Sequence, residues 1–231
     1  YATLGDVAKP EINIITVEDP VEFRMRGINQ VQVNNKAGMT FAAALRSILR
    51  ADPDVVLIGE IRDQETANIA IEASLTGHLV LSTLHTNDAP SAVTRLTEMG
   101  VEPFLLSSSL AAVMAQRLAR RLCKKFKRQD TATEAELRTL GVPHMPDTPL
   151  PTIWRPVGCR ECANTGYSGR VAIQQVMGVD STMEDLIARG ATSIDIDKAA
   201  KEQGMTTLRK DGWQKALQGI TSVEEVLRVT V

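Results

Sequence analysis

The sequence predicts an α/β protein: a doubly wound, mostly parallel sheet, followed by a small cysteine-bearing lobe and a helical carboxy-terminal region. Three apolar stretches separated by helical patterns predict the sheet, and they cover residues 12–17, 55–58 and 79–84. The middle stretch is apolar at every position, which is typical of a strand buried on both faces of a parallel sheet. Short strands that alternate with helices favour parallel βαβ units.

The other elements of the first part follow the same alternation. A short strand is expected at residues 31–33. Residues 40–51 predict an amphipathic helix, because their apolar residues share one face. A second helix covers residues 63–75 and begins at Asp63, a residue type that caps helices well. A third helix covers residues 89–99 and is closed by a glycine.

Helical and strand patterns continue through the second part. Residues 103–122 predict one long amphipathic helix, because apolar residues recur there at helical spacing. Thr133 and Glu136 form a capping box that begins a short helix. Five prolines crowd residues 143–156 and predict an irregular segment. A strand is expected at residues 170–179.

The carboxy-terminal region predicts a series of short helices. Three of them begin near Ser181, Asp195 and Thr206, and glycines close each one. A last helix begins at the capping box formed by Thr221 and Glu224. Together the elements predict three parts: a core at residues 1–122, a cysteine-bearing lobe at 123–170 and a helical subdomain at 171–231.

Composition limits the classes of function. The 231 residues carry a formal net charge of −2 and are 43% hydrophobic, as in ordinary globular chains. No signal peptide or membrane-spanning stretch is recognisable, which predicts a cytoplasmic location. A basic run at residues 117–128 is typical of a solvated helix face, with a neighbouring subunit or acidic lipid as alternative contacts. Nucleic acid is not expected as a partner, because aromatic residues do not alternate with these charges.

Carboxylates follow two of the predicted strands. Glu18 and Asp19 end the first strand, and Glu60 follows the central strand after Gly59. The carboxyl ends of parallel strands form the ligand-binding edge of open α/β sheets, and glycine permits close approach there. The residues alone allow a nucleotide site, but an ordinary surface carboxylate at the end of a buried strand is the more common interpretation.

Three longer segments resemble the signature boxes of one family. Residues 18–23, 59–66 and 76–87 resemble, in order, the Asp box, Walker B box and His box of the type II secretion and type IV pilus assembly ATPases. The resemblance covers nearly the whole chain and implies a RecA-like core. The sequence contains no Gly-Lys-Ser or Gly-Lys-Thr of a P-loop. Residues 1–4 resemble the helix that follows the P-loop in this family, so we expect that the amino end is cut and that the fragment alone is inactive.

The resemblance implies ATP and Mg²⁺ as cofactors. Glu60 is then expected to hold Mg²⁺, directly or through water, with Gly59 allowing close approach. Glu18 is expected to polarise the attacking water, although the two glutamates are interchangeable at this stage. His85 is expected to sense the γ-phosphate or donate to it, with a purely structural histidine as the alternative.

Three further residues of the boxes are expected to contribute to cofactor binding. Asp19 belongs to the Asp box, Arg62 to the Walker B box and His78 to the His box. For Arg62 the ordinary alternative is a surface ion pair. For His78 a structural role is an equal alternative.

The three cysteines resemble part of a four-cysteine element of the same family. Cys159 and Cys162 form a Cys-x-x-Cys pair, but the spacing from Cys123 places Phe126 where a fourth ligand would stand. A closed zinc site needs four ligands, so His144 or water would have to complete it. We expect instead that the thiols do not converge and that apolar packing holds the lobe; the residues for this packing are Phe126, Ile153, Trp154, Val157 and Tyr167.

The resemblance also implies a function. It points to a hexameric motor ATPase at the inner membrane that acts on a membrane platform protein, in type IV pilus assembly or type II secretion. The cysteine-bearing lobe favours this branch over the retraction-type pilus ATPases. A non-catalytic, metal-bearing interaction module remains the alternative for a chain without a P-loop.

Overall fold

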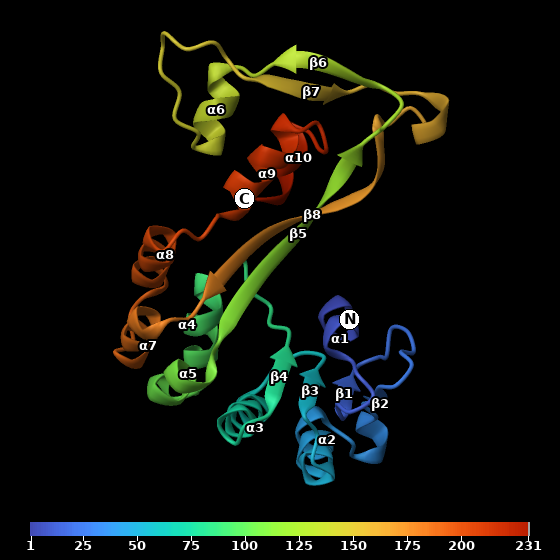
Figure 1. Ribbon diagram of the computed structural model, residues 1–231, viewed down its shortest axis with the longest axis vertical. Coiled ribbons are helices and arrows are strands. Elements are labelled where there is room, and N and C mark those ends of the chain that lie inside the picture. The colour runs from blue at the N-terminus through green and yellow to red at the C-terminus, as the bar shows by residue number, and fades with distance from the viewer. Residues whose placement is uncertain (231) are drawn as a thin grey trace. The chain divides into compact units, whose positions relative to one another are not determined.

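The computed structural model describes residues 1–230, and these form two compact units. The first unit contains residues 1–86, 90–111 and 179–196, and the second contains the rest of the described chain. Each unit is shown in Figure 1 with its elements labelled.

A four-stranded parallel sheet forms the first unit, as predicted (Figure 1). Its order is β2-β1-β3-β4, and the strands are β2 (Asn29–Gln32), β1 (Ile14–Glu18), β3 (Val55–Ile58) and β4 (Leu79–Ser82). Val17 of β1 pairs with Val31 on one side and Ile58 on the other, and Ile58 pairs with Ser82. The carboxyl ends of the strands are therefore level along one edge.

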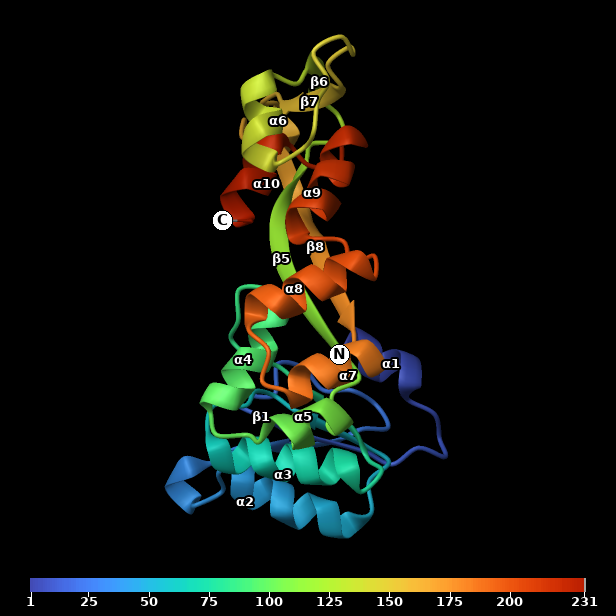
Figure 2. The same ribbon diagram turned by 90° about the vertical axis from the view of Figure 1, so that its left-hand side faces the viewer.

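Helices cover both faces of this sheet, which explains the unbroken apolar character of β3. On one face, α2 (Phe41–Ile48) and α3 (Gln64–Leu75) lie side by side and pack on β1 and β3 (Figure 2). On the other face, α1 (Ala2–Val7) places Leu4 against Ile14 and Val55. Because alternate strand residues point to opposite faces, Glu18 lies on the face that carries Ile14 and α1.

Side-chain caps confirm two predicted helix starts. Thr40 accepts a hydrogen bond from the backbone of Ala43 at the start of α2, and Asp63 does the same for Thr66 in α3. The rest of the first unit comprises η1 (Asn35–Ala37), η2 (Leu49–Ala51), α4 (Pro90–Glu98), α5 (Pro103–Ser109), α7 (Ser181–Ala188) and the start of α8 (Ser193–Glu202).

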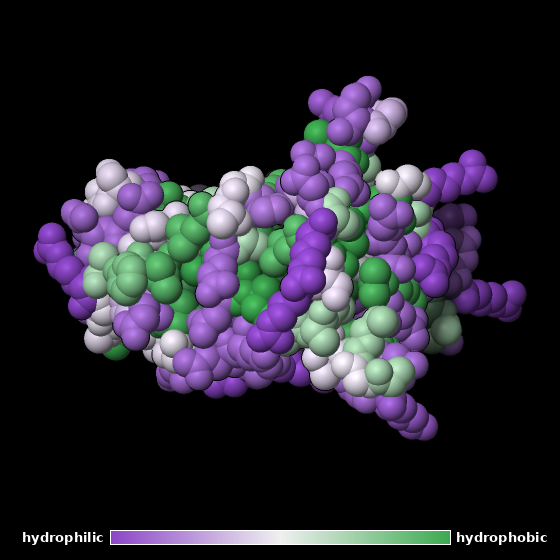
Figure 3. Space-filling model, turned by 90° about the horizontal axis from the view of Figure 1, so that it is seen from below, coloured by the Kyte–Doolittle hydropathy of each residue, from purple (hydrophilic) through white to green (hydrophobic). Residues whose placement is uncertain are grey.

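The outer surface of the first unit mixes polar and apolar residues. Figure 3 shows the side on which α2 and α3 lie, where hydrophilic side chains interrupt the hydrophobic surface. Met39 and Leu75 are among the exposed apolar residues of the first unit. Within residues 1–230, no helix combines the length and the apolar character needed to cross a bilayer.

Two antiparallel strand pairs organise the second unit. One pair is β5 (Ala112–Leu122) with β8 (Tyr167–Gly178), and the other is β6 (Lys127–Thr131) with β7 (Thr152–Pro156). The unit also contains α6 (Glu134–Leu140), η3 (Arg160–Cys162), α9 (Leu208–Leu217) and α10 (Val223–Val229). Its core includes Leu137, Ile153, Ile173, Trp213 and Val226.

The predicted helix at residues 103–122 is wrong beyond its first two turns. Helix α5 ends at Ser109, and the chain continues as β5, in which Ala115 and Ala119 are buried while Met114 and Leu118 are exposed. The apolar spacing that resembles a helix therefore includes residues on the open face of a strand. Pairing with β8 decides the structure here, and local sequence does not reveal that pairing.

Other details of the second unit confirm or correct the expectations. The capping box of Thr133 and Glu136 is present, but the proline-rich segment contains the regular strand β7. The last helix is capped by Ser222, whereas Thr221 is buried and donates its hydroxyl to the backbone oxygen of Arg120. In the expected apolar packing of the lobe, Ile153 is fully buried but Phe126 and Val157 are exposed, so these two do not form its core.

Candidate functional site

The carboxyl edge of the parallel sheet gathers most of the predicted site. Glu18 is the last residue of β1, Glu60 follows β3 and His85 follows β4. Strands β1 and β3 pair directly, as do β3 and β4, so three adjacent strand ends present these side chains along one edge. This is the edge at which open parallel sheets bind ligands.

Gly59 brings two of these strand ends into close contact. Its backbone N–H donates to the oxygen of Val17 at 2.7 Å. A Cβ at this position would lie 3.2 Å from that oxygen and 3.3 Å from the Cα of Glu18. On the other side, Thr83 donates its hydroxyl to the oxygen of Gly59. The group that approaches Gly59 is therefore the backbone of β1.

Glu60 lies between two nitrogen-bearing side chains. Arg62 forms an ion pair with one carboxylate oxygen, and His85 Nε2 lies 3.1 Å from the other. The Glu60 side chain is 14% exposed, whereas that of His85 is 89% exposed. The hydrogen bond from Arg62 lowers the pKa of Glu60 and His85 adds to this effect, while partial burial opposes both. Glu60 is therefore held as a carboxylate at the rim of the sheet.

Glu18 is buried and accepts hydrogen bonds from three side chains. Its donors are the hydroxyls of Tyr1 and Thr16 and the amide of Gln30, which lies 3.1 Å away. The period of two along β1 places Thr16 on the same face as Glu18, so the sequence contained a signal for this contact. Tyr1 directly precedes α1 and Gln30 lies in β2, and no sequence pattern predicts either contact.

The other predicted binding residues lie in different places. Asp19 is exposed next to Glu18. The hydrogen bond that Arg62 donates to Glu60 is the main cause that raises the pKa of Arg62, and the charge of Asp19 adds to it. His78 precedes β4, at the opposite edge of the sheet. Its Nδ1 lies 2.9 Å from the backbone oxygen of Ala73 in α3. The structure therefore brings Asp19 and Arg62 to the carboxylate edge and does not bring His78 there.

The second unit contains a separate cluster of thiols. The Sγ atoms of Cys123, Cys159 and Cys162 all lie within 4.8 Å of one another. The distance from Cys159 is 3.8 Å to Cys123 and 3.6 Å to Cys162. The expectation that the cysteines do not converge is therefore wrong. Cys123 follows β5, and Cys159 and Cys162 precede β8, so the antiparallel pairing of these strands brings the three cysteines together. The backbone N–H of Cys123 continues this pairing by donating to the oxygen of Gly166.

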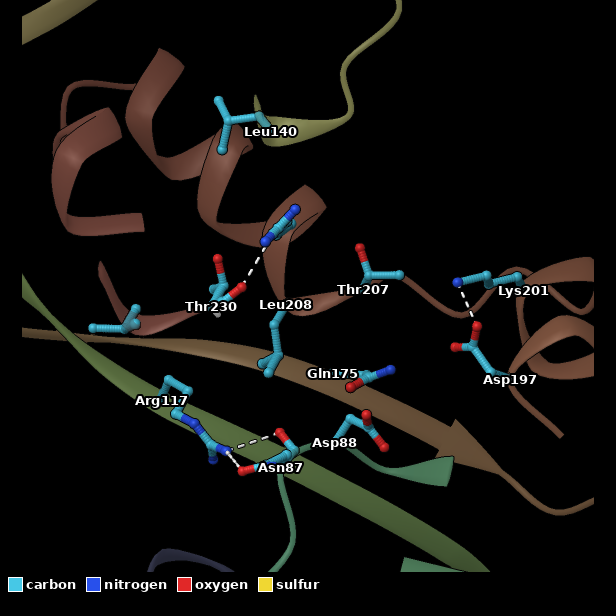
Figure 4. Close-up of a pocket in the computed structure, with 12 residues that line it drawn as sticks. Asn87, Asp88, Arg117, Leu140, Gln175, Asp197, Lys201, Thr207, Leu208 and Thr230 are labelled. Carbon is cyan, nitrogen blue, oxygen red and sulfur yellow. Dashed lines mark hydrogen bonds and ion pairs between the residues drawn. The ribbon is translucent and has the colours of Figure 1, made fainter. Parts of the chain in front are cut away.

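A cavity of about 380 Å³ also lies within the second unit, and Figure 4 shows its lining. Its cationic side chains bond to protein atoms: Arg117 donates to the oxygen of Asn87, Lys201 pairs with Asp197 and Arg209 donates to the oxygen of Thr230. Two other members of the predicted basic run also bond within the unit, since Arg120 pairs with Glu225 and Lys127 donates to Gly219. These cations therefore stabilise the unit itself.

Comparison with known proteins gives close relatives along the whole chain. The chain is 54% identical over 230 residues to type II secretion system protein E of Pseudomonas aeruginosa, covering 100% of this chain and 45% of that protein. Type II secretion system protein E of Aeromonas hydrophila is 50% identical over 230 residues, with the same coverage of 100% and 45%. The type IV pilus assembly ATPase PilB of Thermus thermophilus is 50% identical over 231 residues, which are 100% of this chain and 26% of that protein. The chain spans less than half the length of these relatives.

Solved structures share the fold. The pilus retraction motor PilT with bound ADP matches with a TM-score of 0.63 and 24% identity, over 94% of this chain and 52% of that chain. The ATPase DotB of Legionella pneumophila matches with a TM-score of 0.64 and 21% identity, over 94% and 51%. The profile of the family described as "Type II/IV secretion system protein" matches residues 1–228. On this evidence the chain belongs to the type II/IV secretion system protein family.

Proposed function

We propose that this chain is part of an ATP-hydrolysing motor that powers type IV pilus assembly or type II protein secretion. The main support is the carboxyl edge of the sheet. There Glu60, which contacts Arg62 and His85, and Glu18 follow or end two strands that pair directly. Relatives that are 50% identical to this chain over its whole length bear the names of a secretion protein and a pilus assembly ATPase, which supports this branch. The retraction motor supports only the fold.

The carboxylates of this edge fit a magnesium nucleotide. Mg²⁺ prefers carboxylate oxygens together with phosphates and water, and when bound it neutralises the charge that develops on the phosphates. Glu60 is partly exposed and would hold the ion directly or through water. Glu18 would orient the attacking water, because its carboxylate is fixed by neighbouring hydroxyl and amide donors. His85 would donate to the γ-phosphate.

The assembly of the motor is also a proposal. We expect a homohexamer located in the cytoplasm and peripheral to the inner membrane, in which hydrolysis moves an inner-membrane platform protein. The domain roles expected from the sequence belong to this proposal, with the sheet as the catalytic part and the cysteine-bearing lobe as an attached part.

The test uses the complete protein. Glu60→Gln and Glu18→Gln are each expected to lower ATP turnover by about 100-fold or more, because a carboxylate that serves the ion or the water acts mainly in the transition state. Nucleotide affinity should remain within a few-fold in calorimetry. Glu72→Gln, an exposed change on α3, is the matched control and should turn over ATP normally. Near-normal turnover in Glu60→Gln would refute the proposed role.

We also propose that Cys123, Cys159 and Cys162 bind a zinc ion. Thiolates at about 2.3 Å from zinc in a tetrahedral arrangement lie roughly 3.8 Å from one another. The distances from Cys159 to the other two sulfur atoms, 3.8 and 3.6 Å, fit this spacing. About one equivalent of zinc in protein purified without added metal, lost in Cys159→Ser, would support the proposal.

A further inference from the structure

We infer that the cysteine cluster is an open metal site: three protein thiolates hold the ion and an exchangeable external ligand occupies the fourth position. The inference rests on the zinc binding proposed above and adds a coordination number and a ligand class to it. The external ligand would be water or a small nitrogen or sulfur donor, such as an imidazole or a thiol.

The described chain supplies three ligands and no fourth. Among residues 1–230, no histidine, aspartate or glutamate belongs to the cluster of the three sulfur atoms. His144, the residue expected to complete the site, has its Nδ1 at 3.3 Å from the hydroxyl of Thr148. The nearest carboxylate in sequence, that of Glu161, forms an ion pair with Lys125 at 2.8 Å. Zinc prefers four ligands, so the coordination sphere needs one from outside.

The loop around Cys162 is built to hold its sulfur in place. The backbone N–H groups of Cys159 and Gly166 donate to this sulfur at 3.2 and 3.3 Å. A Cβ on Gly158 would lie 2.5 Å from the backbone oxygen of Asn164, and one on Gly166 would lie 2.5 Å from Pro156. The loop is therefore closely packed at both glycines, which leaves it little freedom to bring another side chain to the ion.

The segment that contains Cys123 shows why the fourth ligand position stays open. Cys159 and Cys162 are three residues apart, and three residues after Cys123 the chain carries Phe126. The Phe126 side chain has no atom that can bind a metal ion. The residue is also 57% exposed, so it does not shield the site from solvent. Zinc sites with three protein ligands are the ones that keep a position for water or substrate.

Cobalt provides a direct test, because four-coordinate Co²⁺ absorbs in the visible range and its bands change when a ligand is exchanged. The complete protein, freed of metal under reducing conditions, is titrated with Co²⁺ alone and then with imidazole. We expect one equivalent of Co²⁺ and a shift of its bands on addition of imidazole. In Phe126→Cys the fourth thiolate should abolish the imidazole shift and slow removal of the metal by a chelator about tenfold or more.

The controls separate the two proposals. Phe126→Ser removes the ring at the same position without adding a thiolate and should behave like the unchanged protein. If the unchanged protein binds no Co²⁺ while Phe126→Cys binds one equivalent, the zinc proposal fails and the open site fails with it. If the unchanged protein binds Co²⁺ but imidazole leaves its bands unchanged, zinc binding stands and only the open position is overturned. The unchanged protein alone decides this last point, even where Phe126→Cys does not fold.

Discussion

Replacement of Glu225 by glutamine is the sharpest test of what holds the second unit together. The Glu225 side chain is 1% exposed in α10. It accepts the backbone N–H of Arg120 at 2.9 Å and the guanidinium groups of Arg120 and Arg228 at 2.6 to 2.9 Å. One carboxylate thus joins β5 to the last helix.

The expected cost follows from the pKa of Glu225. Burial alone would raise this pKa, but the hydrogen bonds from Arg228 and Arg120 lower it from 4.5 to about 2. A fall of that size corresponds to about 3 kcal/mol. Both arginine side chains are about half exposed, so solvent screens the pairs and we expect a loss of about 2 kcal/mol in the free energy of unfolding.

The pH dependence has a definite direction. A carboxylate whose pKa is lowered by folding contributes its stabilisation above the unfolded value near 4.5, and this contribution is lost as the pH falls towards 2. Glu225→Gln should therefore destabilise the second unit at pH 7, and its difference from the unchanged protein should disappear as the pH falls through about 2.

Tryptophan fluorescence measures this unit selectively. The chain has two tryptophans, Trp154 and Trp213, and both lie in the second unit. At pH 7 the melting temperature of Glu225→Gln should fall by about 6 to 10 °C. Glu224→Gln is the matched control, because Glu224 is 52% exposed and its partner Arg155 keeps two other carboxylates. Equal melting temperatures for the two variants would refute the reasoning.

Three further substitutions test other contacts. Arg155→Ala should cost the second unit about 2 kcal/mol in fluorescence-monitored urea unfolding, because its guanidinium pairs with three carboxylates; an unchanged midpoint would contradict this. Gly212→Ala should cost about 1 to 3 kcal/mol by the same assay, since a Cβ would lie 2.6 Å from Val226; a midpoint equal to that of the unchanged protein would contradict this. Gly59→Ala should lower ATP turnover of the complete protein by crowding β1, and a turnover equal to that of the unchanged protein would show that the close approach is not needed.

The part of the fold that local patterns determine could be predicted from the sequence. Strand β3 has apolar residues at every position because helices cover both faces of the sheet. The carboxylates Glu18 and Glu60 meet at one edge because the ends of parallel strands always do. Asp63 caps α3 because its side chain accepts the hydrogen bond that the helix start leaves open.

Long-range contacts set the rest, and the sequence does not display them locally. Residues 112–122 have a helical apolar spacing, yet they pair with a strand that follows much later in the chain. The convergence of Cys123 with Cys159 depends on the same pairing, which no local pattern of the sequence shows. The contact between Tyr1 and Glu18 likewise requires α1 to be placed on the sheet first.

The pairing of β5 with β8 also determines where this chain can change in length. Residues 123–166 connect β5 to β8, and the backbone hydrogen bond from Cys123 to Gly166 joins the two ends of this connection. Between α6 and β7, residues 143–149 are irregular and mostly exposed. Doubling the length of a closed loop costs only about 0.6 kcal/mol in entropy. This segment can therefore accept an inserted peptide or a fluorescent label, while the strands and the thiol cluster keep their register.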